Sequence, residues 1–166
     1  SETRKYPAVI NSIFFAPCAW YMSYHLGAWR ALKEFGYLTN IKSLGGGSSG
    51  SLTAVLLASN IDDEIIKKKL DAFAITYPTF LCWGKMTRIV GSAIDEYLND
   101  SIDCWKFSSY VVITNFQNDF PPIGPRFINI NKDFDKNKIK NLILSSCYIP
   151  IMYEEVPKWD NKFVIE

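Results

Sequence analysis

A glycine- and serine-rich turn contains the residues of this sequence that are best suited to chemistry. Gly46, Ser48 and Gly50 satisfy the pattern G-x-S-x-G, in which a serine on a strained strand-to-helix turn projects its hydroxyl above a sheet. The two glycines leave room for that backbone and for close packing of the helix. The backbone N–H of Ser49, at the positive end of the helix, can stabilise an oxyanion. The pattern predicts Ser48 as the nucleophile of an acyl transfer.

Two other interpretations of the same turn stay open. A glycine- and serine-rich turn between a strand and a helix can be ordinary tight-turn chemistry. Gly45, Gly47 and Gly50 also match the dinucleotide-binding pattern G-x-G-x-x-G. Against that second interpretation, the turn follows the second predicted strand, and no acidic residue ends a third strand about 20 residues later. No Lys-Ser or Lys-Thr pair closes the glycine run, which excludes a P-loop.

Strands and helices alternate along the chain and set the position of this turn. Short apolar, β-branched runs predict strands, and apolar residues spaced three and four apart predict helices. The predicted strands are 8–16, 41–44, 109–114, 127–130 and 162–166, and the predicted helices are 22–35, 52–59, 62–78, 92–98 and 138–146. The third and fourth strands, separated by a proline-rich turn, are expected to form a hairpin. This order predicts an α/β fold with a largely parallel sheet covered on both faces, in one domain over 1–166.

Composition and charge exclude several classes of protein. The 18 Lys and Arg residues nearly balance the 17 Asp and Glu residues, so no basic field is available to bind nucleic acid. No apolar run reaches the roughly 20 residues of a membrane-spanning helix, and no secretory signal is visible. The wide cysteine spacing and the single histidine favour buried thiols over disulfides or a zinc site. A cytoplasmic protein without a metal is expected.

The segment 79–91 is rich in large apolar residues and is harder to assign. Phe80, Leu81 and Trp83 could contact lipid near the mouth of a site, as part of a loop or lid. Ordinary core packing accounts for the same residues and is the favoured interpretation.

Three segments in order resemble the patatin-like phospholipase family. They are 15–36, which contains His25-Leu26-Gly27, then 46–52 with the G-x-S-x-G turn, and 142–150 with the run Ser-Ser-Cys-Tyr-Ile-Pro. The resemblance covers nearly the whole chain and implies a three-layer α/β/α fold with Ser48 on a nucleophile elbow. It also implies a Ser–Asp dyad without histidine, hydrolysis of lipid acyl esters, and no cofactor.

One departure from the family pattern concerns the oxyanion loop. Where the family has G-G-G-x-R-G, this sequence has the run Pro-Cys-Ala-Trp-Tyr-Met. Pro17 has no N–H, so the expected oxyanion donors are the backbone N–H groups of Cys18, Ala19, Trp20 and Ser49. Non-glycine residues restrict that backbone. A poor oxyanion loop would slow the enzyme, because one lost donor costs on the order of 10²–10³ in rate.

The second departure concerns the partner of Ser48. The family takes its aspartate from D-G-G or D-G-A at the end of a late strand, and this sequence stops at Glu166, where that motif is expected. The aspartate then lies beyond the sequence, or Glu166 or Asp160 takes its place, and the spacing favours Glu166. His25 lies within the first helix, where the family also carries a histidine without catalytic use. A packing or capping role is therefore expected for His25.

These features predict a serine hydrolase that releases fatty acid from phospholipid or neutral lipid through an acyl-enzyme on Ser48. Lipid acyl esters are the expected partners, and the resemblance implies contact with a membrane or lipid-droplet surface. One alternative is a non-catalytic relative that binds lipid or a protein partner, motivated by the altered oxyanion loop and the missing D-G-G. The other is a nucleotide-binding domain that uses the turn 45–50.

Overall fold

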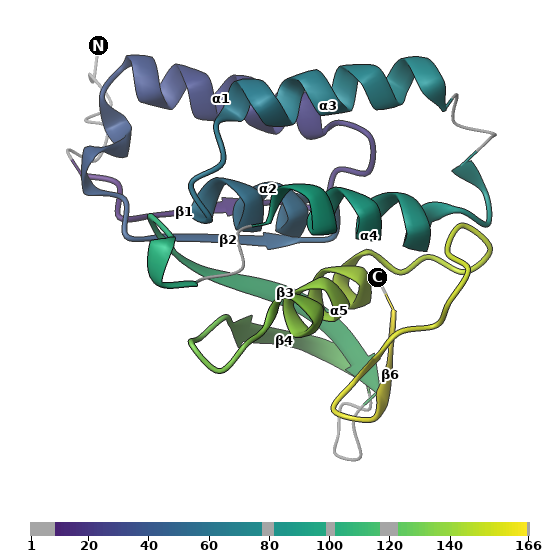
Figure 1. Cartoon of the computed structure of the whole chain (residues 1–166). Helices are drawn as coiled ribbons and strands as arrows, with labels where there is room; N and C mark the ends of the chain where they lie inside the picture. The colour runs from purple at the N-terminus through teal and green to yellow at the C-terminus, as the bar shows by residue number, and fades with distance from the viewer. Residues whose placement is uncertain (1–8, 78–81, 99–101, 117–122, 166) are drawn as a thin grey trace, which may run out of the picture.

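The computed structural model describes residues 9–77, 82–98, 102–116 and 123–165, and its strands form one sheet (Figure 1). The strands are β1 Ser12–Phe15, β2 Ser43–Gly47, β3 Ser108–Phe116, β4 Ile123–Asn129, β5 Lys158–Trp159 and β6 Lys162–Ile165. β1, β2 and β3 run parallel. β4 and β6 pair antiparallel with β3, and β5 pairs with β6. The predicted hairpin of the third and fourth strands is confirmed.

Helices alternate with the parallel strands, which confirms the predicted α/β class. They are α1 Met22–Glu34, α2 Ser49–Ala58, α3 Asp63–Thr76, α4 Met86–Tyr97 and α5 Lys136–Cys147, with 3₁₀ turns at Tyr37–Asn40 and Ile102–Cys104. Within the described ranges, no helix combines the length and apolar character that crossing a bilayer requires.

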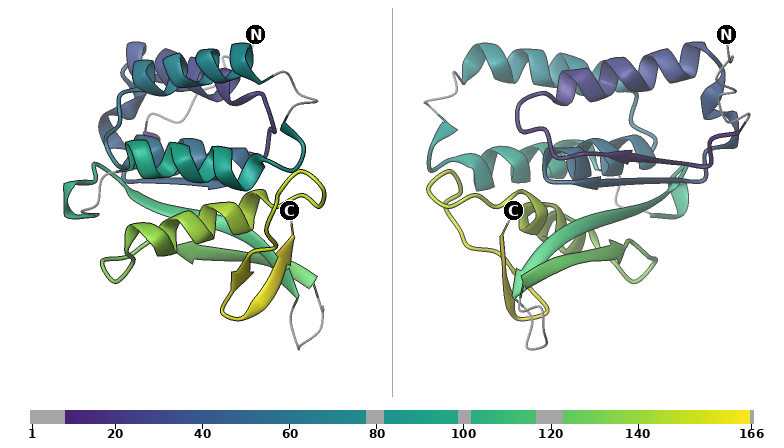
Figure 2. Two further views of the ribbon diagram at one scale, coloured as in Figure 1. Left: turned by 45° about the vertical axis from the view of Figure 1, so that its right-hand side comes forward. Right: turned by 180° about the vertical axis from the view of Figure 1, so that it is seen from behind.

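The parallel strands fix where the helices lie. The connections from β1 to β2 and from β2 to β3 step across the sheet in the same direction, and right-handed crossovers then carry their helices to one face. α2 packs directly on β1, β2 and β3, while α5 packs on β3 and α2. α1 lies against α2 and α3. Successive layers are therefore the sheet, then α2 with α4 and α5, then α1 with α3 (Figures 1 and 2).

The two faces of the sheet carry different side chains. Phe15 is 4% exposed on the face that contacts α2, whereas its neighbour Phe14 is 47% exposed on the other. The Tyr110 ring lies between those of Phe14 and Phe127 on that outer face, with centroids 6.2 and 6.1 Å away. The main core therefore lies between the sheet and α2, where Leu44 and Val55 are fully buried. Among the described helices none covers the other face, so the cover on both faces expected from the sequence is not seen in this part of the chain.

The start of α4 differs from the sequence prediction. The prediction begins this helix at residue 92, but α4 begins at Met86. The Glu154 carboxylate accepts hydrogen bonds from the backbone N–H groups of Thr87 (2.6 Å) and Arg88 (3.4 Å). Such a cap satisfies the first N–H groups of a helix. Met86, Val90 and Ile94 are buried at a spacing of four, so the apolar period of the helix extends to this start and the sequence prediction missed it.

The Glu154 cap predicts a pH-dependent contribution to stability. Burial alone would raise the pKa of Glu154, but hydrogen bonds from backbone N–H groups and the Thr87 hydroxyl outweigh burial and lower the pKa below its ordinary value of 4.5. The cap therefore stabilises the fold above about pH 4.5, and its contribution is lost as the pH falls through the lowered pKa. Glu154→Gln is expected to cost about 1 kcal/mol at pH 7. Urea unfolding at pH 7 and pH 3 checks this, because the difference in stability between the two proteins should be smaller at pH 3.

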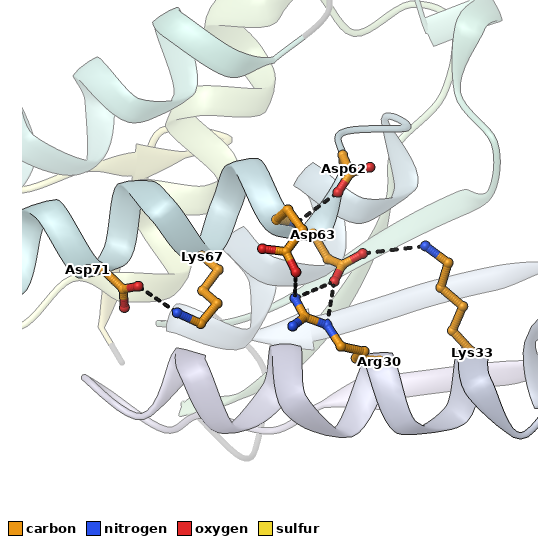
Figure 3. A network of polar contacts seen from close by, with 7 residues as sticks. Arg30, Lys33, Asp62, Asp63, Lys67 and Asp71 are labelled. Atoms are coloured by element: carbon orange, nitrogen blue, oxygen red, sulfur yellow. Dashed lines mark hydrogen bonds and ion pairs between the residues drawn. The ribbon is translucent and has the colours of Figure 1, made fainter.

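An ion-pair network joins α1 to the first turn of α3 (Figure 3). The Asp63 side chain is 6% exposed, and one of its oxygens accepts from Arg30 Nε at 3.1 Å and Nη2 at 2.9 Å. Lys33 approaches its other oxygen at 3.6 Å, and Arg30 also pairs with Glu64 at 2.6 Å. Asp62 caps the helix by accepting from the Glu64 N–H. The network fixes α1 against α3 at the end distant from the glycine-rich turn.

Arg30→Met is expected to lower the melting temperature, because it leaves the Asp63 carboxylate buried with Lys33 as its remaining cation. The matched control is Lys67→Met, which breaks the solvent-exposed Lys67–Asp71 pair on α3. Exposed pairs contribute little, so this control should melt close to the wild type in a thermal scan. Equal melting temperatures for the two variants would contradict a structural role for the buried network.

Candidate active site

Ser48 lies on a strained turn between β2 and α2. Its backbone has φ 51° and ψ −131°, and it is the N-cap of α2. A non-glycine residue rarely adopts such a conformation, which persists only where the surroundings enforce it. Here Ser51 enforces it, because its N–H and its hydroxyl both donate to the Ser48 carbonyl, at 2.9 and 2.6 Å. This is the geometry of a nucleophile elbow.

The two glycines of the motif are required by close backbone packing. A Cβ on Gly46 would meet the backbone of Gly50, and a Cβ on Gly50 would meet the carbonyl groups of Phe15 and Ala16, all well under 3.0 Å. Any side chain at either position would push α2 away from β1 and β2. The glycines therefore set the height at which Ser48 stands above the sheet.

An apolar cavity of about 200 Å³ opens beside Ser48. Its walls are formed by α2, α3, α4 and the segment that follows α5, with Leu52, Phe73, Val90 and Met152 among the lining side chains. Lys69 is the charged residue in the lining, and Glu96 pairs with it at 2.7 Å. A hydroxyl at the wall of an apolar cavity can meet an ester whose hydrocarbon part occupies the cavity.

Ser146 holds the elbow against β3, a role that the sequence analysis missed. The Ser48 N–H donates to Ser146 Oγ at 2.8 Å, and the Ser146 hydroxyl in turn donates to the Val112 carbonyl. Ser146 thereby links α5, β3 and the candidate nucleophile through a buried hydroxyl. The available signal was the Ser-Ser-Cys-Tyr-Ile-Pro run, in which the second serine is the one that reaches Ser48.

The segment 18–20, predicted to supply oxyanion donors, lies at the cavity, but its backbone N–H groups differ in their surroundings. Cys18 N–H donates to Ser49 Oγ at 3.2 Å, so the structure directs it away from the Ser48 hydroxyl. Ala19, Trp20 and Ser49 line the cavity. Ala19 has φ 47°, which turns the chain sharply before α1. Ser49 is the first residue of α2, whose opening N–H groups have no partner within the helix.

His25 interacts with the oxyanion segment rather than with Ser48. Its Nδ1 lies 3.5 Å from Cys18 Sγ, which is also 3.2 Å from Ser49 Oγ. The His25 ring packs at a tilt on Phe15, with centroids 5.3 Å apart. Burial lowers the pKa of His25, which favours a neutral ring that braces this segment. This placement agrees with the packing role expected from the sequence.

The strand register directs the end of β6 toward Ser48. β4 occupies one edge of β3 over Tyr110–Phe116, so β2 and β6 share the other edge. Gly47 at the end of β2 faces Val112, and Ile165 at the end of β6 faces Thr114. The C-terminal ends of β2 and β6 therefore point toward each other and lie about 7 Å apart along β3. Glu166 follows directly but lies outside the described residues.

Asp160, the other carboxylate considered from the sequence, is not brought to Ser48. It lies in the turn between β5 and β6 with φ 50°. Its side chain is 65% exposed and 3.9 Å from Arg126. All of β6 separates Asp160 from the strand end that points toward the nucleophile elbow.

The fold and the site define an α/β protein with a serine on a nucleophile elbow beside an apolar cavity. The family model for patatin-like phospholipase matches residues 15–164, so the chain belongs to the patatin-like phospholipase family. At the level of the family, this identifies a lipid hydrolase. A search of curated proteins found no match. Family membership favours the hydrolase interpretation of the glycine-rich turn over the dinucleotide-binding one.

Proposed function

We propose that this protein hydrolyses acyl esters of phospholipid or neutral lipid, with Ser48 as the nucleophile. The observation that carries the proposal is the strained Ser48 elbow at the wall of an apolar cavity. The acyl chain lies in the cavity, and its ester carbonyl lies against Ser48 Oγ. The cavity excludes water from the hydrocarbon, which favours fatty acyl groups over polar ones.

The reaction has two steps, acylation of Ser48 and hydrolysis of the acyl-enzyme. Ser48 Oγ attacks the ester carbonyl while a carboxylate at position 166 or beyond accepts the hydroxyl proton. The proton then passes to the leaving alcohol as the C–O bond breaks, which leaves an acyl-enzyme. Water attacks the acyl-enzyme, loses its proton to the same carboxylate, and releases the fatty acid as Ser48 regains its proton. N–H groups of Ser49, Ala19 and Trp20 stabilise the oxyanion in both steps.

Hydrolysis of a short-chain p-nitrophenyl ester and of phosphatidylcholine vesicles tests the proposal. The wild type should release p-nitrophenol and fatty acid, and Ser48→Ala should lose at least about 10³-fold in rate, as nucleophile removal does in serine hydrolases. Ser145→Ala is the matched serine control, because it removes a buried hydroxyl that has no hydrogen-bond partner among the described residues. Equal rates for wild type and Ser48→Ala would overturn the proposal.

A second candidate function is lipid binding without turnover. It is favoured by the Cys18 N–H, which donates to Ser49 Oγ and so leaves the oxyanion segment with fewer donors. Retention of a fatty acid in the cavity together with absent hydrolysis by the wild type would select this second function.

A further inference from the structure

The wall of the cavity beside Ser48 includes a lysine among its apolar side chains. Phe73 lines the cavity from α3, and Ile89 and Ala93 line it from α4, two helices that run alongside each other (Figures 1 and 2). Lys69, on α3, is the one charged side chain among the described residues of this lining. A lysine can lay its hydrocarbon stem along an apolar wall while its ammonium group stays in water. The Lys69 side chain is 45% exposed, as this arrangement requires.

The Lys69 ammonium group bridges the two helices. Its Nζ lies 2.7 Å from a carboxylate oxygen of Glu96 on α4, and 5.4 Å from the centroid of the Tyr97 ring. The hydrogen bond between Lys69 and Glu96 raises the pKa of the lysine and lowers the pKa of the glutamate, so both groups are charged at neutral pH. The pair is therefore a charged contact between the α3 wall and the α4 wall of an apolar cavity.

The Lys69–Glu96 pair lies at the end of the cavity distant from the oxyanion segment. The Trp20 ring stacks on Phe73 with centroids 5.5 Å apart, which places the oxyanion segment beside Phe73. Lys69 precedes Phe73 by one helical turn and lies about 6 Å further along α3. On α4, Ala93 and Glu96 are three residues apart and share a helix face. The pair and Ala93 therefore mark one end of the cavity, which we call the distal end.

The size of the cavity sets the length of the chain that it can hold. A cavity of about 150 Å³ accommodates benzene, so a cavity of about 200 Å³ accommodates about eight carbons. The length of the cavity agrees with its volume. Met86 and Ala93 both line it and lie about 10 Å apart along α4, and an extended chain advances about 1.2 Å per bond.

We propose that the Lys69–Glu96 ion pair closes the distal end of the cavity and limits the acyl chain to about eight carbons, an inference that rests on the proposed function. Up to this length, each added methylene is buried and raises kcat/KM about fourfold. A longer chain must displace Lys69, and the methylenes beyond the pair enter water. The preferred substrates are therefore esters of medium-chain fatty acids.

A chain-length profile tests this limit, with p-nitrophenyl butyrate, octanoate and dodecanoate each kept below the concentration at which it forms micelles. The wild type should show a kcat/KM for octanoate at least about tenfold above that for either other ester. Lys69→Ala opens the distal end, so the ratio of dodecanoate to octanoate should rise at least about tenfold. Ala93→Leu fills the distal end, so the ratio of octanoate to butyrate should fall at least about tenfold. Ratios within one variant do not depend on how much of the protein is folded.

Lys67→Ala is the matched control. It breaks the Lys67–Asp71 pair on the outer side of α3, whose side chains are 45% and 54% exposed, against 45% and 52% for Lys69 and Glu96. This control should keep the wild-type profile. The same ratios in all four proteins, or a control that shifts the profile as far as Lys69→Ala does, would overturn the chain-length limit.

Binding of free fatty acids separates failure of the limit from failure of the proposed function. In isothermal titration calorimetry, Lys69→Ala should increase the affinity for dodecanoate, relative to octanoate, at least about tenfold over the wild type. Such binding in a protein that hydrolyses none of the three esters would leave the limit standing and overturn the proposed function. Hydrolysis by the wild type with a profile that Lys69→Ala and Ala93→Leu leave unchanged would overturn the limit alone.

Discussion

Gly50→Ala is expected to prevent stable folding, because the new methyl group would enter the carbonyl groups of Phe15, the last residue of β1, and of Ala16, which follows it. Overpacking typically costs about 1–3 kcal/mol, and a clash with backbone exceeds that range because neither partner can rotate away. A loss above about 3 kcal/mol is a large part of the total stability of a domain. Urea unfolding, with far-UV circular dichroism for a variant that does not fold, measures the effect.

Gly27→Ala is the matched control for this prediction. Gly27 lies inside α1, and a Cβ there would meet nothing within 4 Å. Alanine is the better helix former, so this variant should be more stable than the wild type by about 0.5–1 kcal/mol. Similar changes in the free energy of unfolding for the two variants would contradict the claim that Gly50 is required for the close packing of α2 on β1.

Ser146→Ala is expected to lower the catalytic rate, because Ser146 positions Ser48. It leaves the buried Ser48 N–H without its acceptor, which costs about 1–3 kcal/mol. Ser48 then loses the contact that fixes the elbow to β3, so kcat should fall by about tenfold or more while KM changes little. If the role of Ser146 were purely structural, Ser146→Ala would lower the stability of the protein without lowering the kcat of the folded enzyme.

The neighbouring serine provides the control for Ser146. Ser145 is fully buried, and its hydroxyl has no hydrogen-bond partner in the described structure. Removing a buried, unsatisfied hydroxyl is neutral or stabilising, so Ser145→Ala should keep wild-type kinetics and equal or greater stability. Steady-state kinetics and thermal melts on the two alanine variants check this. A kcat for Ser146→Ala equal to that of Ser145→Ala would contradict the positioning role.

The strand–turn–helix around Ser48 was predictable because its determinants are local. The motif glycines are needed wherever a helix passes this close to a strand, and Met22–Glu34 follows the helical spacing of Leu26 and Trp29. Residues that act through distant contacts were not predictable. Ser146 reaches Ser48 across 98 positions, and Glu154 caps a helix 67 positions earlier. No periodicity in one sequence encodes such pairs.

Two features of the site depend on backbone geometry that composition does not reveal. The sequence could not show that the Cys18 N–H turns to Ser49 Oγ, because this follows from the positive φ of Ala19 and the position of α2. Nor could it separate Trp83 from its buried neighbour Cys82, since both belong to one apolar run. Trp83 is 57% exposed, so the core packing favoured from the sequence is wrong for this residue, while Phe80 and Leu81 lie outside the described residues. The Gly84 N–H beside Trp83 donates to the Ile151 carbonyl, a contact between distant segments.

The central claim, that Ser48 is an activated nucleophile, is tested most directly by labelling with a fluorophosphonate ester mimic. The reagent forms a covalent bond to an activated serine, and mass spectrometry of the digested protein locates it. We predict that the label lies on Ser48, that Ser48→Ala abolishes labelling, and that Ser145→Ala labels like the wild type. Absence of labelling in both this chain and any longer form of the protein, or a label on another serine, would contradict the account.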